Sequence, residues 1–142
     1  MERTPRCKKA IDHAKQVFGR FGHTHVGSGH LVLGLLTLNG GVGDTVLKRA
    51  GLSTELVERF LSSKHETSEE VVEMEGVSFG SSATDAIARA ESEAAAIKHT
   101  YLGVEHLTMA LLAEEHGDAT DLLASLHIDR AKLRKTILDE IR

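Results

Sequence analysis

Apolar residues recur along the chain at the spacing of amphipathic α-helices, separated by short polar segments that contain glycine. The first such stretch begins at Thr4 and Pro5, which suit a helix start because threonine caps free N–H groups and proline has none to leave unpaired. Apolar residues then follow three and four positions apart as far as Gly22, where we expect the helix to end. The next stretch, residues 29–38, is apolar on nearly every face, which predicts a helix at the centre of a domain.

Two residues shape the expectations for this central helix. Ser28 directly precedes it and is a candidate N-cap. Gly34 lies within it and has no side chain, so a neighbouring helix can approach closely. After a glycine-containing break, the pattern predicts a short helix near 43–50 and a fourth helix capped by Ser53.

The same pattern returns 76 residues later, from His23 to His99, without a gap. The first copy reads His23-Thr24-His25-Val26-Gly27-Ser28-Gly29-His30-Leu31, and the second reads His99-Thr100-Tyr101-Leu102-Gly103-Val104-Glu105-His106-Leu107. The second copy predicts helices near 82–97, 104–115, 118–126 and 130–141, the last of them capped by Asp129. A constant offset indicates one structural unit used twice. We therefore expect an all-α fold of about eight helices, in which two four-helix repeats are related by a pseudo-twofold arrangement.

The repeats define the boundaries of a single domain over residues 1–142. Repeat one covers about 4–62, an acidic linker covers 63–80, and repeat two covers about 81–142. The linker contains five glutamates and five apolar residues: Glu66, Glu69, Glu70, Glu73 and Glu75, with Val71, Val72, Met74, Val77 and Phe79. We expect an exposed, solvated loop that the apolar residues anchor in places, and no pair of strands. In the alternative interpretation, the glutamates attract a basic partner.

Composition narrows the class of protein. The chain has 142 residues, 41% of them hydrophobic, and a formal charge of −4 from interspersed acidic and basic residues. Such mixing argues against nucleic-acid binding, which needs clustered Lys and Arg. Cys7 is the single cysteine, so no internal disulfide can form, and no secretory or membrane-spanning segment is apparent. We expect a cytoplasmic protein without membrane contact, unless an organelle transit peptide has been removed.

The glycines at 22 and 27 have the spacing of a phosphate-binding loop, but the loop lacks its essential lysine. Ser28 and Gly29 stand where Lys and Ser/Thr are required, and no strand precedes them. Nothing would reach the terminal phosphates of a nucleotide. We therefore expect no nucleotide and no other cofactor.

Six residues occupy equivalent positions in the two repeat turns: His23, Gly27, His30, His99, Gly103 and His106. We expect each histidine to hydrogen-bond the loop before the second helix of its repeat, a structural role in a shared turn. In the alternative, His23, His25 and His30 bind a metal ion for a hydrolase, with Cys7 as a candidate nucleophile. No Cys or acidic residue lies at zinc-ligand spacing, and the counterpart of Cys7 is Ala83, which favours packing. We expect no metal and no catalysis.

The two copies of the turn, each a Gly-x-x-His-Leu segment that leads into a leucine-rich helix, resemble the Clp amino-terminal domain of AAA+ unfoldases, over roughly residues 3–141. The resemblance implies a non-enzymatic module that sits above an ATPase ring and receives adaptors or substrates for unfolding and degradation. A free-standing protein of the same fold, which regulates access of adaptors or substrates, is the alternative. A stop codon after Arg142 would favour the alternative, and continuation into a Walker motif would favour the unfoldase.

The resemblance also implies two candidate binding residues, Glu105 and Thr4. In some members of the family, glutamates before the repeated histidines hold the guanidinium of a phosphorylated arginine, and a threonine at the start of each repeat helps to hold the phosphate. This chain keeps Glu105 and Thr4, but their counterparts are Gly29 and Gly80. The alternative interpretation of Glu105 is that its negative charge stabilises the first turn of a helix.

Overall fold

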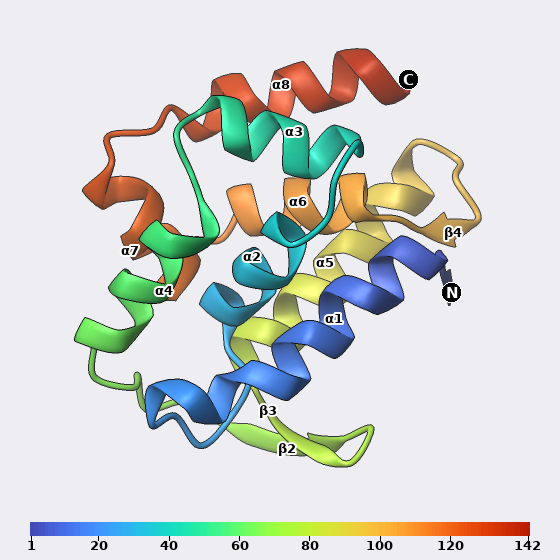
Figure 1. Ribbon diagram of the computed structural model, residues 1–142. Coiled ribbons are helices and arrows are strands. Elements are labelled where there is room, and N and C mark those ends of the chain that lie inside the picture. The colour runs from blue at the N-terminus through green and yellow to red at the C-terminus, as the bar shows by residue number, and fades with distance from the viewer.

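The structure, a computed structural model, describes residues 1–142 and consists of eight α-helices with four short strands (Figure 1). The helices are α1 (Pro5–Val17), α2 (Ser28–Leu36), α3 (Val42–Arg49), α4 (Thr54–Ser63), α5 (Ser81–Ala96), α6 (Val104–Leu112), α7 (Asp118–Ser125) and α8 (Arg130–Ile141). The strands are β1 (Glu2–Arg3), β2 (Val71–Met74), β3 (Val77–Gly80) and β4 (Tyr101–Leu102), and a 3₁₀ helix, η1, covers Phe18–Phe21. The predicted class, all-α with two four-helix repeats, is confirmed.

Helices α2 and α6 form the centre of the domain (Figure 1). All nine residues of α2 are buried, and in α6 only Glu105 is not. Helix α1 packs on α2 and helix α5 packs on α6, while α3 and α8 cover α6 and α4 and α7 cover α2. The helices without a polar face are therefore the buried ones, as their composition predicts.

The two repeats interlock through exchanged backbone segments. The Thr4 N–H at the start of repeat one donates to the Leu102 carbonyl of repeat two, at 2.9 Å. The Gly80 N–H, just before repeat two begins, donates to the Val26 carbonyl of repeat one, at 2.8 Å. The two hydrogen bonds are equivalent, because Gly80 is the counterpart of Thr4 and Leu102 is the counterpart of Val26, each 76 residues later in the sequence. Each repeat therefore completes the turn of the other.

Several local predictions are confirmed. The side chains of Thr4, Ser53 and Asp129 cap α1, α4 and α8 by accepting a backbone N–H. A Cβ added at Gly34 would lie 2.1 Å from the carbonyl oxygen of Ala10, so α1 approaches the backbone of α2 at this residue. Gly22 ends the first helical segment in a left-handed conformation, with φ of 76°, although its last turn is the 3₁₀ helix η1.

The prediction that Ser28 caps α2 was wrong. Gly27 holds the N-cap position, and its N–H is bound by the side chain of His30. The Ser28 hydroxyl instead accepts the N–H of Ala119 at the start of α7, at 3.1 Å. Because the His30 side chain binds the free N–H at the start of α2, the Ser28 hydroxyl is available to link α2 to α7.

The expectation of a linker without strands was also wrong. Strands β2 and β3 form an antiparallel hairpin, closed by a two-residue turn in which Glu75 and Gly76 have φ of 53° and 85°. Phe79 on β3 is completely buried and also forms a bridge with Val26. These partners lie far away in the sequence, so short-range alternation does not reveal the hairpin.

Candidate binding site at the ends of the central helices

In each repeat, two histidines and one glycine form the same hydrogen-bonded chain at the start of the central helix. The Gly27 N–H donates to His30 Nδ1 at 2.8 Å, and His30 Nε2 lies 2.8 Å from His23 Nδ1. In repeat two, Gly103 donates to His106 at 2.9 Å, and His106 lies 2.8 Å from His99. The helix begins where this chain binds its first free N–H.

The donors determine the tautomers. Because His30 Nδ1 accepts a hydrogen bond, its proton is on Nε2 and is donated to His23. The remaining proton of His23 is then on Nε2, which is buried and has no partner. Burial lowers the pKa of His30 to about 3, and the nearby His23 and His25 act in the same direction. Burial also lowers the pKa of His106. The central helices thus start on neutral imidazoles.

Glu105 and Thr4 lie at the same end of the domain. Glu105 is the second residue of α6 and is half-buried, and its side chain forms no hydrogen bond or ion pair with the rest of the chain. Its carboxylate lies over Gly103, where an added Cβ would be 2.0 Å from Oε1. The backbone of Thr4 bonds Leu102 in the loop that leads into α6. The Glu105 carboxylate is therefore an unpaired anion beside the starts of α1 and α6.

Cys7 lies next to this region but inside the core. Its side chain is fully buried on α1, at the position equivalent to Ala83. Burial raises the pKa of the Cys7 thiol to about 11, and the charge of Glu105 acts in the same direction. The thiol stays protonated at neutral pH, so it is an unreactive packing group.

The equivalent end of α2 is closed. A Cβ added at Gly29 would lie 2.9 Å from Leu61 on α4 and 3.0 Å from Asp118 on α7. The linker secures this closure, because Lys64 forms ion pairs with Asp118, at 3.3 Å, and with Asp121. A glutamate at position 29 would need these helices to move apart. The half of the domain around Gly29 therefore has no room for a carboxylate equivalent to that of Glu105.

Two linker glutamates, Glu66 and Glu69, enclose His25. Glu69 lies 3.1 Å from His25 Nε2 and accepts the backbone N–H of Ser82 at 2.6 Å, at the start of α5. Glu66 lies 3.3 Å from His25 Nδ1 and accepts the N–H of Thr24 at 2.6 Å. Burial raises the pKa of Glu66, but hydrogen bonds from Thr24 and His25 together with the charge of His25 outweigh burial and lower it. Most of the linker is exposed and Phe79 anchors it, as expected, but Glu66 and Glu69 also attach it to the domain through hydrogen bonds. The residues that make these contacts come from three segments that are distant in the sequence, so no local sequence pattern predicts the contacts.

No three or more His, Cys, Asp or Glu side chains are arranged so that they could hold a metal ion. His23 and His30 bind each other, and His25 turns toward the linker carboxylates. No helix combines the length and the apolar character needed to cross a bilayer.

Comparison with known proteins gives the same architecture. The sequence model of the Clp repeat (R) N-terminal domain matches residues 2–126 and 78–142. The chain belongs to this family. A probable ATP-dependent Clp protease ATP-binding subunit of Chlamydia pneumoniae is 30% identical over 138 residues, which are 97% of this chain and 16% of that protein. The chaperone protein ClpC3 of Oryza sativa chloroplasts is 32% identical over 95% of this chain and 14% of its own length.

Solved structures share the fold of this Clp repeat domain at low sequence identity. The N-terminal domain of the chaperone ClpD from Arabidopsis thaliana superposes with a TM-score of 0.79, 19% identity, and coverage of 99% of this chain and 94% of that domain. The Hsp104 N-terminal domain from Candida albicans gives a TM-score of 0.76 at 15% identity, with 97% and 90% coverage. The chain spans about a sixth of the length of the curated relatives it matches.

Proposed function

We propose that this Clp repeat domain is a protein-binding module that docks adaptors or substrates for a Clp-type AAA+ unfoldase and has no catalytic activity of its own. Membership of the Clp repeat family supports the proposal. The observation that carries it is the unpaired carboxylate of Glu105 at the start of α6, held open toward solvent while its neighbours Gly103 and His106 are buried. An anion kept without a partner at a rigid helix end is available to a cationic group of another protein.

A phosphorylated arginine matches the chemistry of this end of the domain. A carboxylate binds a guanidinium through two parallel hydrogen bonds, and helix N-termini attract phosphate. Glu105 would bind the guanidinium, and the starts of α1 and α6 would face the phosphate. The Thr4 hydroxyl accepts the N–H of Cys7 but keeps its own proton to donate. Since the Gly29 end is closed, we expect one such ligand per domain.

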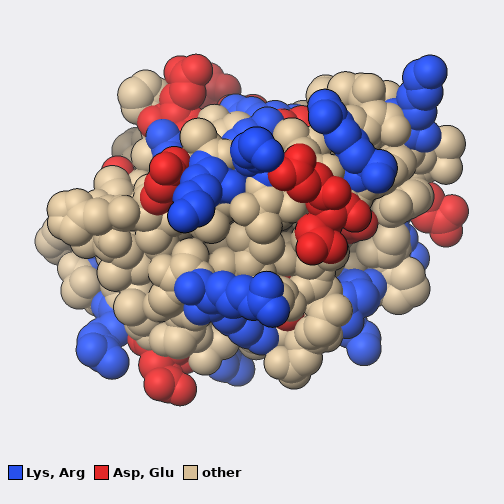
Figure 2. All heavy atoms as spheres, turned by 90° about the horizontal axis from the view of Figure 1, so that it is seen from above, with Lys and Arg blue, Asp and Glu red and all other residues tan.

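Adaptors need a broader surface, for which the groove between the repeats is the candidate. A cavity of about 410 Å³ separates α3 of repeat one from α8 of repeat two. Val46, Ala50 and Leu133 line it, with Arg49 and Lys132 among its polar residues. Figure 2 shows the face that carries these helices, on which acidic and basic groups are interspersed. Such a surface suits modest interfaces of roughly 1,000–1,600 Å² that exchange partners.

Titration with free phosphoarginine tests the ligand, with shifts of backbone amides at the start of α6 as the signal. We expect Glu105→Ala to weaken binding at least tenfold, about the effect of losing a charged hydrogen bond. Glu115→Ala is the matched control, since Glu115 is exposed beyond the end of α6 and forms no ion pair. Equal affinity in the parent and both variants would remove Glu105 from the mechanism.

The wider proposal is tested with purified Clp adaptors and with arginine-phosphorylated and unmodified substrate proteins on an immobilised domain. Binding that depends on the α3–α8 groove or on Glu105 supports it. If the folded domain captures neither the adaptors nor the substrate proteins, the proposal of a protein-binding module is wrong, whatever the outcome with phosphoarginine.

A further inference from the structure

The hairpin of β2 and β3 has one unpaired edge. Backbone groups in an antiparallel pair alternate between those that bond the partner strand and those that point away. The Ser81 N–H donates to the Glu70 carbonyl, so residues 70, 72 and 74 face β3. The backbone groups of Val71 and Glu73 therefore point outward. On its other side, β3 already binds Val26, which donates to Ser78 and accepts from Gly80.

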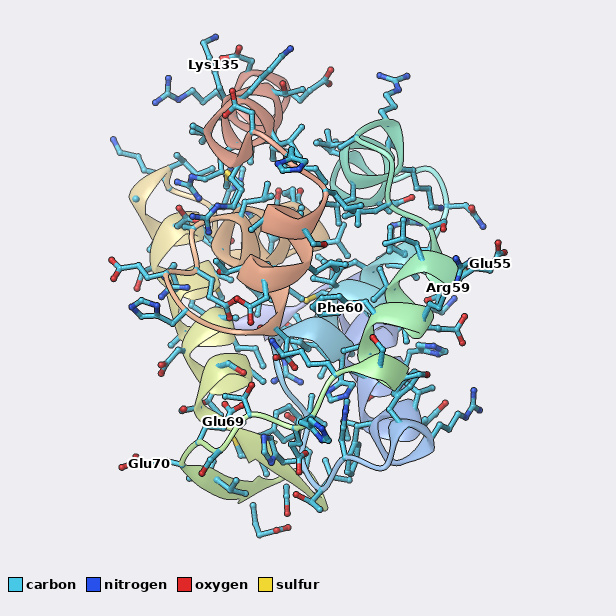
Figure 3. All side chains as sticks on the ribbon, turned by 90° about the vertical axis from the view of Figure 1, so that its left-hand side faces the viewer. Glu55, Arg59, Phe60, Glu69, Glu70 and Lys135 are labelled. Atoms are coloured by element: carbon cyan, nitrogen blue, oxygen red, sulfur yellow. The ribbon has the colours of Figure 1, made fainter.

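The free edge of β2 carries exposed apolar side chains and unpaired charges. Val71 and Val72 are 46% and 50% exposed, two of the four large apolar residues in the chain that are exposed. Glu70 and Glu73, on either side of them, are exposed and form no ion pair. Glu73 accepts a hydrogen bond from the Ser78 hydroxyl on β3, and Glu70 projects away from the domain (Figure 3). Such a surface has apolar contacts to offer but favours a partner with positive charge.

The edge is held in place by the rest of the domain. Phe79 anchors β3 in the core. At the turn, Glu75 forms ion pairs with Arg3, at 3.0 Å, and with Lys15, at 3.5 Å. At the base of the hairpin, Glu69 binds the start of α5. A strand that is already fixed loses little conformational freedom when a peptide binds beside it.

We propose that the free edge of β2 binds an extended segment of another protein by strand addition, and that this segment carries Lys or Arg on either side of two apolar residues, which matches the order Glu70-Val71-Val72-Glu73. The backbone groups of Val71 and Glu73 would supply the hydrogen bonds, and Glu70 and Glu73, which have no ion-pair partner, would each face one basic side chain. A second copy of the domain is a poor occupant, because its own Glu70 and Glu73 would meet these carboxylates. The proposal rests on the substrate-binding function above and adds the kind of segment that is held.

The probe is an eight-residue peptide in which Lys-Val-Val-Lys is repeated twice, capped at both ends and added to the isotope-labelled domain. We expect the amides of Val71 and Glu73 to become protected from hydrogen exchange, while the amides of residues 72 and 74 change little. The same peptide methylated at every amide nitrogen keeps its charge but has no N–H to donate, and should bind at least tenfold more weakly.

Charge selection is tested with Glu70→Lys/Glu73→Lys, which should weaken binding of the Lys-Val peptide about tenfold or more. The matched control is Glu55→Lys/Glu140→Lys, which changes the net charge equally at exposed, unpaired sites on α4 and α8. Glu55 lies on the opposite side of the molecule from Glu70 in Figure 3. Val71→Pro, which removes one outward N–H without removing a bond to β3, provides a second variant if the first fails to fold.

Equal binding of the methylated peptide, equal weakening by both charge reversals, or unchanged exchange at Val71 and Glu73 would overturn strand addition. A dimer in sedimentation that Val71→Pro abolishes would overturn the assigned occupant in favour of a second copy. Phosphoarginine titration of the same variants separates the two proposals. If the domain fails to bind the peptide but binds phosphoarginine, the function proposed above still stands. If it binds the peptide but not phosphoarginine, strand addition at the edge of β2 still stands.

Discussion

In each histidine pair, one imidazole both accepts the free N–H at the start of a helix and donates its own proton to the second histidine. His30 binds the free N–H of Gly27, and its own proton is bound by His23. A carboxylate at this position would also bind the N–H, but it would bring a full charge into a buried site. A neutral imidazole accepts on one side and donates on the other, so the turn is satisfied without net charge. The same arrangement in repeat two indicates that this role is structural.

Neutral buried histidines make stability depend on pH. The pKa of His30 falls from 6.5 in the unfolded chain to about 3 in the folded domain, so the unfolded chain binds more protons between these values. Stability is therefore complete above pH 6.5 and falls as the pH decreases toward 3. We expect unfolding to require about 2 kcal/mol less at pH 5 than at pH 7 from this residue.

Denaturant titrations at the two pH values measure this loss, and His30→Gln, which cannot titrate, serves as the comparison. The pH dependence should be smaller in the variant, even though the variant is less stable overall. An identical dependence in both proteins would show that other groups cause it.

At the scale of elements, a single small residue determines how closely two helices pack. Helix α1 crosses α2 where Gly34 leaves room for the carbonyl of Ala10. The equivalent residue in α6 is Ala110, which is also small and buried. Small residues at both crossings help a core with 4% aromatic residues to fill its interior.

Gly34→Ala tests this packing. Alanine normally stabilises a helix by up to about 1 kcal/mol relative to glycine, but here its Cβ would lie 2.1 Å from backbone that cannot move aside. We expect a net loss of roughly 1–3 kcal/mol in unfolding free energy, measured by denaturant titration. Gly19→Ala is the control, because nothing lies within 4 Å of an added Cβ there, and it should be neutral or stabilising. A variant at Gly34 as stable as the parent would contradict the tight crossing.

At the scale of the whole molecule, the repeats depend on each other. The strand that precedes α1 pairs with β4 of repeat two, and the end of β3 pairs with Val26 of repeat one. Helices α2 and α6 are also in contact, and α3 packs across the repeat boundary on α6. An isolated repeat would expose both the turn and the apolar surface that its partner covers. We therefore expect the domain to unfold as one cooperative unit, although its sequence is duplicated.

Separate expression of residues 1–80 and 81–142 tests this dependence. We expect each half to show little helix by circular dichroism and no cooperative melting, because each loses the partner of its central helix. Mixing the halves should restore helicity. Cooperative melting of either half alone would show that the repeats are independent domains.

The asymmetry between the two ends also belongs to this scale. Repeat two keeps Glu105 free, whereas the corresponding end of repeat one is covered by α4, α7 and the linker. Residues such as Lys64 and Asp118 have no unusual sequence context, and only the folded chain brings them together. The sequence indicates that Gly29 lacks a carboxylate, but not that its surroundings have closed over it.

The sequence alone determined the helices, the caps of α1, α4 and α8, the duplication and the all-α class, because these depend on spacing within a few residues and on a long exact offset. It also singled out the turn histidines and Glu105. Only the tertiary structure decided the hairpin in the linker and the exchange of strands between the repeats. It alone also shows that Glu69 binds the start of α5 and which side chains fill the space around Gly29. Each of these depends on contacts between residues distant in the chain, whose free energy becomes available only when the core has brought them together.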